Sequence, residues 1–216
     1  MELREQRFGI EIEMTGITRA GAAKVAATYF GTRSEYVGTY YQTYAAVDQE
    51  GRQWKFMSDG SIRAEKKVNG EKRAAGAVYR TEMVSPICRY EDIEKIQELI
   101  RELKKKGAIV NESCGIHVHI DASPFDAGKL RNLTNIMAAK EDLIYKALGV
   151  SVERQHRWCR PVEERFLEEL NRRRPTSMEA VEEIWYNGRS RRGQHYDQSR
   201  YHCLNLHSVF QKGTVE

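Results

Sequence analysis

Two histidines lie on one short stretch of alternating sequence. Residues 115–121 read Gly-Ile-His-Val-His-Ile-Asp. Successive side chains of a β-strand point to opposite faces of the sheet, so this alternation predicts a strand with one apolar and one polar face. We expect its two isoleucines and its valine to point into a core, with His117, His119 and an aspartate on the other face. Two imidazoles and a carboxylate in one row indicate a binding or catalytic surface.

A second alternating stretch carries two carboxylates. Residues 8–14 read Phe-Gly-Ile-Glu-Ile-Glu-Met, which predicts a strand with Glu11 and Glu13 on the same face. Two residues of strand rise place these side chains about 6.6 Å apart. Like charges this close repel each other unless a cation or an arginine lies between them. On an isolated edge strand they would simply face solvent.

A third predicted strand, over residues 78–87, contains a single carboxylate, Glu82. A carboxylate among apolar residues must be paired, protonated or bound to a metal. Arg80 lies on the same side of the strand and is the simplest candidate partner. Pro86 is expected to end the strand.

Carboxylates combined with one or two imidazoles are ligands that suit Mg²⁺ or Mn²⁺. Such a site can hold the cations that neutralise nucleotide phosphates during phosphoryl transfer. The His-x-His pair is also used by zinc hydrolases, so a metal-dependent hydrolase acting through His117 and His119 remains an alternative. A binding module without catalytic activity is a third interpretation.

The composition is typical of a globular protein. The chain has 216 residues, and its net charge of +4 is too small to indicate a nucleic-acid partner. The basic run over 189–192 is expected to be a solvated loop rather than a nucleic-acid site, and an anionic substrate could use it. The charged N-terminus lacks the pattern of a signal peptide, no segment is apolar enough to span a membrane, and four cysteines are scattered. These features predict a cytoplasmic protein with free thiols.

The remaining pattern predicts an α+β fold. Thr18 and Gly31 are expected to cap and end a helix. Two further long helices are expected, one over 90–106 and one that starts at Ser123-Pro124. The other expected elements are strands within 36–57 around a turn at 48–51, a mobile loop over 64–76, a helical insertion over 150–188 with helices starting at Arg160-Pro161 and Ser177, a polar loop over 187–199, and a strand over 200–207.

Five stretches, in this order, resemble the successive motifs of the putative amidoligase family. They are Phe-Gly-Ile-Glu-Ile-Glu from residue 8, Asp-Gly-Ser from 59, Glu-Met-Val-Ser-Pro from 82, Cys-Gly-Ile-His-Val-His-Ile-Asp from 114, and Arg-Tyr-His-Cys-Leu-Asn from 200. The Gly-Ile-His-Val-His segment also resembles the Gly-Met-His-Val-His stretch of glutamine synthetases. The resemblance runs from residue 7 to the end of the sequence.

This resemblance implies one catalytic domain over residues 1–216, with the 150–188 insertion before the last strands. Its core would be a curved antiparallel sheet with helices on one face, as in glutamine synthetase and glutamate–cysteine ligase. Its concave face would bind ATP and divalent cations, Mg²⁺ or Mn²⁺. The implied reaction activates a carboxylate as an acyl phosphate, which an amine then attacks to form an amide.

The resemblance also implies roles for individual residues. Asp59 would lie near the substrate amine, and Arg200 would contact a phosphate or a carboxylate as a catalytic residue. His119, Arg200 and Asn205 would bind the nucleotide. The implied metal ligands are Glu11, Glu13, Glu82, His117 and Glu216.

Members of the family carry a Glu-x-Arg motif on a closing strand. Thr214-Val215-Glu216 supplies the glutamate at the end of this sequence, so we expect a chain that lacks its last strands. The substrates would be an amine and a carboxylate of an amino acid, a peptide or a protein side chain, with no membrane or nucleic-acid partner.

Overall fold

The computed structural model describes residues 2–216, which form two compact units. The N-terminal unit ends at Val118 and the C-terminal unit begins at His119. The fold is α+β, as predicted, with an antiparallel sheet in the order β2-β3-β4-β7-β1-β8-β9. Its strands are β1 (Phe8–Met14), β2 (Ser34–Gly38), β3 (Thr43–Val47), β4 (Gln53–Met57), β7 (Thr81–Val84), β8 (Ile116–Asp121) and β9 (Thr214–Val215).

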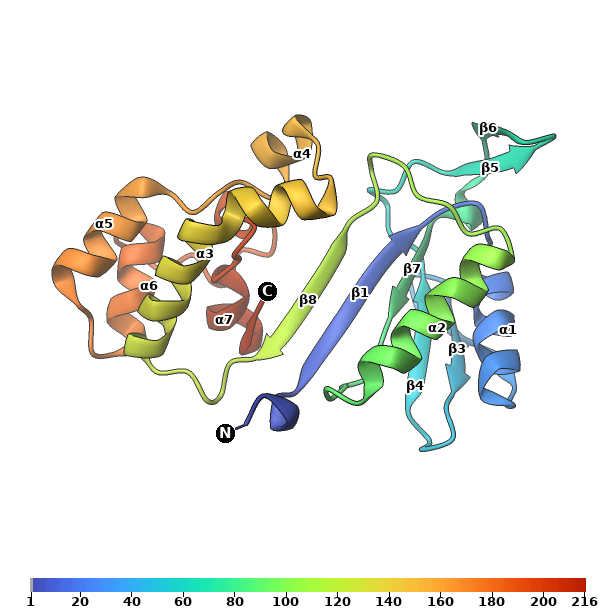
Figure 1. Ribbon diagram of the computed structural model, residues 1–216, viewed down its shortest axis with the longest axis horizontal. Helices are drawn as coiled ribbons and strands as arrows, with labels where there is room; N and C mark the ends of the chain where they lie inside the picture. Colours follow the sequence, from blue (N-terminus) through green and yellow to red (C-terminus); the bar gives the residue numbers. More distant parts are fainter. Residues whose placement is uncertain (1) are drawn as a thin grey trace. The chain divides into compact units, whose positions relative to one another are not determined.

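Two helices cover one face of the sheet in the N-terminal unit, α1 (Arg19–Phe30) and α2 (Asp92–Lys105) (Figure 1). Helix α1 begins and ends as predicted: the Thr18 hydroxyl accepts a hydrogen bond from the Gly21 amide at 3.1 Å, and Gly31 adopts a left-handed conformation. Apolar side chains from both helices and from β1, β4 and β7 form one core. Its largest members include Phe30, Trp54, Phe56, Met83, Leu99 and Leu103.

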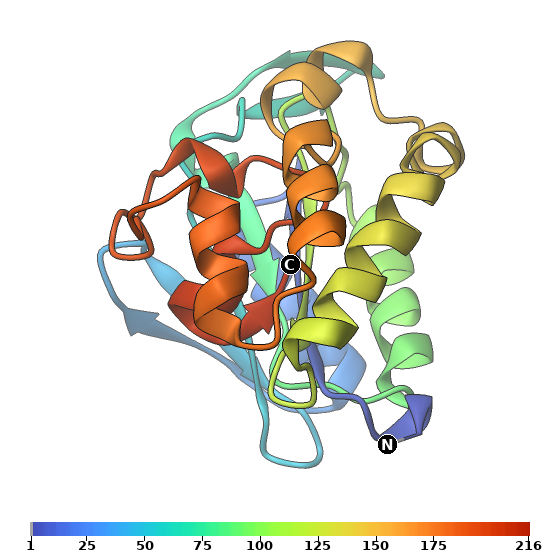
Figure 2. The same cartoon turned by 90° about the vertical axis from the view of Figure 1, so that its left-hand side faces the viewer.

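Five helices build most of the C-terminal unit. Figure 2 shows α3, α5 and α6 beside one another, and they share a core that includes Leu130, Phe166 and Leu170. No helix among residues 2–216 is long and apolar enough to cross a membrane. The helices are α3 (Ala127–Leu148), α4 (Val152–Arg157), α5 (Glu164–Arg173), α6 (Met178–Tyr186) and α7 (His207–Lys212), and short 3₁₀ turns occur at Leu3–Glu5, Ala77–Tyr79 and Gln198–Arg200.

The predicted mobile loop over 64–76 is wrong. These residues contain a two-stranded hairpin, β5 (Glu65–Val68) and β6 (Glu71–Ala74). Asn69 and Gly70 connect the strands, and both have positive φ angles. Asn-Gly favours this tight hairpin turn, since both residues tolerate positive φ. The many charged residues on the strands obscured that signal.

The predicted strand over 200–207 is also wrong. The chain forms a 3₁₀ turn that ends at Arg200, and helix α7 begins at His207. Leu206, Val209 and Phe210 follow the spacing of one helix face, and all three contact the core of the C-terminal unit. A short alternation at 204–207 was therefore part of a turn rather than of a strand.

The apolar residues at the start of β8 were predicted to be buried, but they are more exposed than the histidines between them. The side chains of Ile116 and Val118 are 64% and 41% exposed, whereas His117 and His119 are half-buried. Only Ile120 packs against a core as expected. The polar face of this strand is thus the more enclosed one in its first half.

Several helix starts also differ. Helix α3 is capped by Asp126 rather than beginning at Ser123-Pro124, because the Asp126 carboxylate accepts the Lys129 amide at 2.8 Å. Helix α5 begins at Glu164, after Pro161. Helices α4 to α6 lie within the predicted insertion over 150–188. That the two units act as one catalytic domain stays a prediction.

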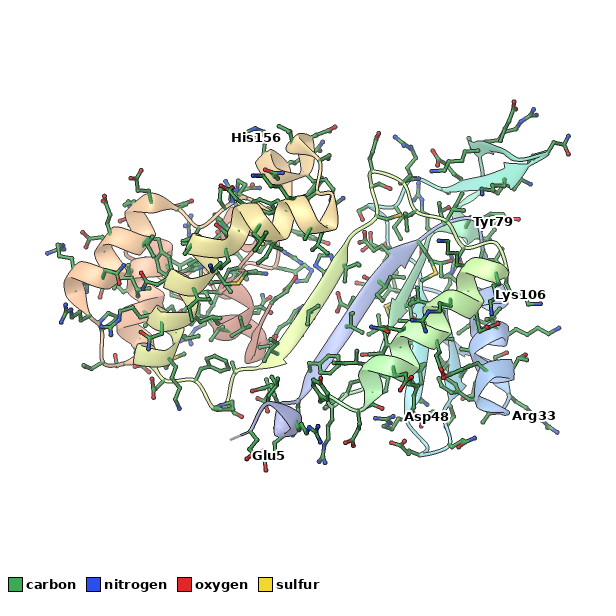
Figure 3. The ribbon with its side chains drawn as sticks, viewed as in Figure 1. Glu5, Arg33, Asp48, Tyr79, Lys106 and His156 are labelled. Carbon is green, nitrogen blue, oxygen red and sulfur yellow. The ribbon has the colours of Figure 1, made fainter. Side chains whose placement is uncertain are left out.

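Helix α2 is fixed to the turn between β3 and β4 by a buried ionic network. The Arg52 guanidinium donates to both oxygens of Asp92 at 2.8 and 2.9 Å, and to Asp48 at 2.9 Å. Figure 3 labels Asp48, whose carboxylate also accepts from the Trp54 indole. Arg52 is the main reason why the pKa of Asp92 lies well below its usual range. The bidentate pair therefore holds the first turn of α2 against the sheet.

We expect Asp92→Asn to lower the free energy of unfolding by about 1–3 kcal/mol at pH 7, because it leaves part of the Arg52 fork without an acceptor. The difference in unfolding free energy between wild type and variant should shrink as the pH falls below about 4. There Asp92 gains a proton in the unfolded wild-type chain but stays ionised in the folded one. Urea denaturation measures both effects. The exposed pair of Glu102 and Lys105 gives a control: Glu102→Gln should cost less than about 0.5 kcal/mol. Equal costs for the two variants would contradict this role of Asp92.

Candidate metal centre

Strand pairing brings two glutamates face to face. Glu13 on β1 is directly opposite Glu82 on β7, and Glu82 is also paired with Met57 at the end of β4. Directly opposed residues have side chains on the same face, close enough to interact. The two carboxylates are 6% and 9% exposed, so their repulsion is weakly screened by water.

Asp59 completes a cluster of three carboxylates. It follows β4 by two residues, and one oxygen from each of Glu13, Asp59 and Glu82 can be chosen such that all three lie within 4.8 Å of one another. Asp59 is half-buried. Its Oδ1 accepts a hydrogen bond from the Ser61 amide at 2.6 Å, which fixes the carboxylate in the Asp-Gly-Ser turn.

The glutamate of β1 is held by the start of the His-x-His segment. The Gly115 amide donates to Glu13 Oε2 at 2.6 Å, and the Glu13 amide donates to the Gly115 carbonyl at 3.0 Å. His117 Nε2 lies 4.0 Å from Glu13 Oε1. Ser61 Oγ is 3.5 Å from the same oxygen. Both Glu13 oxygens therefore have polar neighbours within the N-terminal unit.

The pKa of Glu82 shows that the negative charges of this cluster repel one another. Burial, followed by the charges of Glu11, Asp59 and Glu13, raises the pKa of Glu82 to about 8, and His117 opposes the rise. A carboxyl group with this pKa is mostly protonated at neutral pH when no cation is bound. A divalent cation bound by the carboxylates would replace that proton and remove the repulsion. Three carboxylate oxygens are a hard ligand set that fits Mg²⁺ or Mn²⁺.

Arg80 does not serve as the partner that the sequence suggested for Glu82. Among residues 2–216, no arginine nitrogen lies within 4.0 Å of the Glu82 carboxylate, and the Arg80 Nε is buried without a hydrogen bond. The backbone before β7 is fixed differently. Arg19 on α1 donates to the carbonyls of Ala77 and Arg80 at 2.8 and 3.0 Å.

A second group of predicted site residues meets in the C-terminal unit. His119 Nδ1 lies 3.1 Å from the Thr214 hydroxyl and 3.8 Å from Glu216 Oε2. Asn205 Nδ2 donates to the same Glu216 oxygen at 2.9 Å, and the Asn205 amide donates to the Glu216 carbonyl at 2.7 Å. Asn205 and Glu216 are thus tied together beside His119.

Arg200 lies outside these contacts. Its guanidinium donates to the His195 carbonyl at 2.8 Å and lies 5.6 Å from the centre of the Tyr201 ring. The structure thus brings Glu13, Asp59 and Glu82 into one cluster, with Glu11 and His117 close enough to shift the pKa of Glu82. The roles assigned to all these residues stay predictions.

The place of Asp59 among the carboxylates was not expected from the sequence, which assigned it to the substrate amine. A signal for it was present. Asp59 comes two residues after Met57, and Met57 is paired with Glu82. Strand order, which the sequence does not show, was needed to recognise this proximity.

Comparison with known families agrees with the motif resemblance. A sequence family described as putative amidoligase enzyme matches residues 4–216. The chain belongs to this putative amidoligase family. No curated protein and no solved structure matches the chain. The family match includes every member of the carboxylate cluster and both histidines of β8.

The proton on Glu82 predicts an unusual pH dependence of stability. Without divalent cations, folded Glu82 keeps its proton up to about pH 8, whereas in the unfolded chain it loses the proton near pH 4–5. The free energy of unfolding should therefore fall as the pH rises from about 5 to 8, by about 1.4 kcal/mol for each unit of pKa shift.

Glu82→Gln should remove this loss, since an amide of the same shape cannot ionise. Urea denaturation in EDTA at pH 5, 7 and 9 measures it: the variant should be more stable than wild type at pH 9, and the gain should shrink toward pH 5. The exposed Glu168 provides a control, because Glu168→Gln should follow the wild-type curve. Parallel curves for wild type and Glu82→Gln would contradict the raised pKa.

Proposed function

We propose that this protein is an ATP-dependent carboxylate–amine ligase, which forms an amide bond through an acyl phosphate. The observation that supports this most is the cluster of Glu13, Asp59 and Glu82, of which the two glutamates are buried, in a member of the putative amidoligase family. Such a cluster is costly to fold unless a cation occupies it. Retaining it is reasonable where the cation takes part in the reaction.

The proposed metal ligands are Glu13 and Glu82, with Glu11, His117 and Glu216 as further ligands. Bound Mg²⁺ or Mn²⁺ with ATP would supply the phosphoryl group and neutralise its charge as it is transferred to the substrate carboxylate. Glu82, once it has lost its proton, would be a negatively charged ligand of the cation. Glu13 is already oriented for this by the Gly115 amide.

Asp59 has a separate proposed role, because it is the most exposed of the three carboxylates. Its free lone pairs can bind the ammonium group of the amine substrate and hold the proton that the amine must lose before it attacks. Attack by the amine nitrogen on the activated carbonyl then forms the C–N bond and expels phosphate. Arg200 is proposed to contact the transferring group, and His119 and Asn205 to contact the nucleotide.

The antiparallel sheet, with α1 and α2 on one face, is the arrangement expected for a core of the glutamine synthetase type, which we include in the proposal. A zinc hydrolase is less well supported. The residues 2–216 contain one group of three or more acidic, histidine or cysteine side chains at metal-binding distances, and it consists of carboxylates alone. Oxygen ligands favour Mg²⁺ or Mn²⁺ over Zn²⁺.

Binding of Mg²⁺–ATP, measured by calorimetry, is the first test of this function. Wild type should bind Mg²⁺–ATP, and Glu13→Gln should weaken binding at least tenfold, because it removes one charged ligand (about 1.4 kcal/mol or more). Glu168→Gln, which changes an exposed glutamate, should bind as wild type does. Tight binding of Zn²⁺ without any binding of Mg²⁺–ATP would contradict the proposal.

Acyl-phosphate formation can be tested without knowledge of the amine. Hydroxylamine attacks acyl phosphates to give hydroxamates, so a pool of amino acids and small peptides with ATP, Mg²⁺ and hydroxylamine should yield a hydroxamate and ADP. Glu13→Gln should reduce the yield by about a hundredfold or more. ATP hydrolysis that is unaffected by carboxylate and by Glu13→Gln would refute the ligase reaction.

A further inference from the structure

A polar groove of about 730 Å³ lies on the C-terminal unit, between α3 and the end of α5. The two helices are neighbours (Figure 2) and are fixed to a common core by Leu130 and Leu170, which are fully buried. The groove is therefore built on rigid elements. Its lining residues are Arg131, Asn132, Asn135, Ile136, Asn171 and Arg174.

Two of these side chains, Arg131 and Arg174, are positively charged and form no ion pair among the described residues. Among the described residues, no carboxylate oxygen lies within 4.0 Å of the guanidinium of Arg131 or Arg174. The neighbouring arginines on α5 differ: Arg172 pairs with Glu169 at 2.6 Å, and Arg173 pairs with Glu183 at 3.2 Å. The groove thus has one uncompensated positive charge on each wall and no acidic residue in its lining.

A second pocket on the same unit shows the contrast. It is smaller, about 350 Å³, and its lining includes Arg165, Glu169, Arg173 and Glu183. Its lining thus has two arginines and two glutamates, and Arg173 and Glu183 form an ion pair. This pocket neutralises itself, whereas the groove between α3 and α5 does not.

Two of the asparagine side chains in the groove hold each other in place. Asn135 and Asn171 exchange two hydrogen bonds, at 3.0 and 2.9 Å, and Asn135 also donates to the Arg131 carbonyl at 2.8 Å. The Asn171 amide is held in one orientation and keeps one N–H and one lone pair for a ligand. Asn132 is exposed and keeps all its donors and acceptors for one. Each can pair with the N–H and C=O of a peptide unit.

An apolar contact lies between these polar groups. Ile136, on the same wall as Asn132, is 60% exposed. A free phosphate or acetate ion would fill a small part of 730 Å³ and would leave this side chain uncovered. A groove of this volume has room for a ligand larger than a single small ion.

We propose that this groove binds an acidic peptide segment, in which carboxylates flank an apolar residue. The flanking carboxylates pair with Arg131 and Arg174, the Asn132 and Asn171 amides hold the peptide backbone, and the apolar side chain covers Ile136. The partner is therefore a protein or peptide with an exposed acidic segment. This inference stands on the groove alone and does not depend on the ligase activity.

Fluorescence polarisation with a labelled Glu-Asp-Leu-Glu-Asp peptide and the full chain tests the proposal. The peptide should bind saturably at low ionic strength, and Arg131→Gln and Arg174→Gln should each weaken binding about fivefold to tenfold, since each removes a charge-assisted pair. A Gln-Asn-Leu-Gln-Asn peptide should not bind measurably. Replacing the leucine by glycine should weaken binding severalfold.

Arg172→Gln is the matched control, because it removes the same charge from the same end of α5 but from an arginine already paired with Glu169. It should change affinity less than twofold. Equal losses in Arg172→Gln and Arg174→Gln would overturn the proposal, since they would show attraction by overall charge. No binding of the acidic peptide, or tighter binding of a single-stranded oligonucleotide of equal charge, would overturn it as well. Unchanged thermal unfolding of the variants would confirm that they are folded.

Discussion

Repulsion among buried carboxylates is the constraint on which the site depends. Glu13 and Glu82 are opposed across two paired strands, and Asp59 is brought to them by the turn after β4. In water these charges would separate, but the sheet fixes the distance between them. The energy of the arrangement is therefore set by what neutralises it, either a proton on Glu82 or a cation. The same repulsion that costs stability would favour a divalent ion bound between the carboxylates.

The rest of the N-terminal unit keeps the carboxylates from moving apart. Arg19 fixes the backbone that leads into β7, and the Gly115 amide holds a Glu13 oxygen. The Arg52–Asp92 pair fixes α2 behind the sheet. Together these contacts preorganise the carboxylates, so a cation that bound there would not incur the cost of collecting its ligands. In the C-terminal unit, Asn205 and Glu216 form a separate polar group with His119.

The sequence alone predicted that Glu13 and His117 lie on strands, because the alternation in residues 8–14 and 115–121 is complete. It could not show that Asp59 would join Glu13 and Glu82, since that depends on the pairing of β4 with β7. Two local predictions were wrong. The hairpin turn at Asn69-Gly70 was missed because charged residues surround it, and the short alternation before α7 was taken for a strand. The exposure of Ile116 and Val118 shows that alternation predicts two faces of a strand but not which one is enclosed.

Proton release on metal binding tests the central claim most directly. Titration of Mn²⁺ into the metal-free protein at pH 7, in two buffers of different ionisation enthalpy, measures the protons released for each ion bound. Because the pKa of Glu82 is about 8 in the absence of metal, binding should release about 0.9 proton per ion at pH 7, and close to none at pH 9.5. Metal binding without proton release at pH 7, or no metal binding, would contradict the claim that a cation replaces a proton on Glu82.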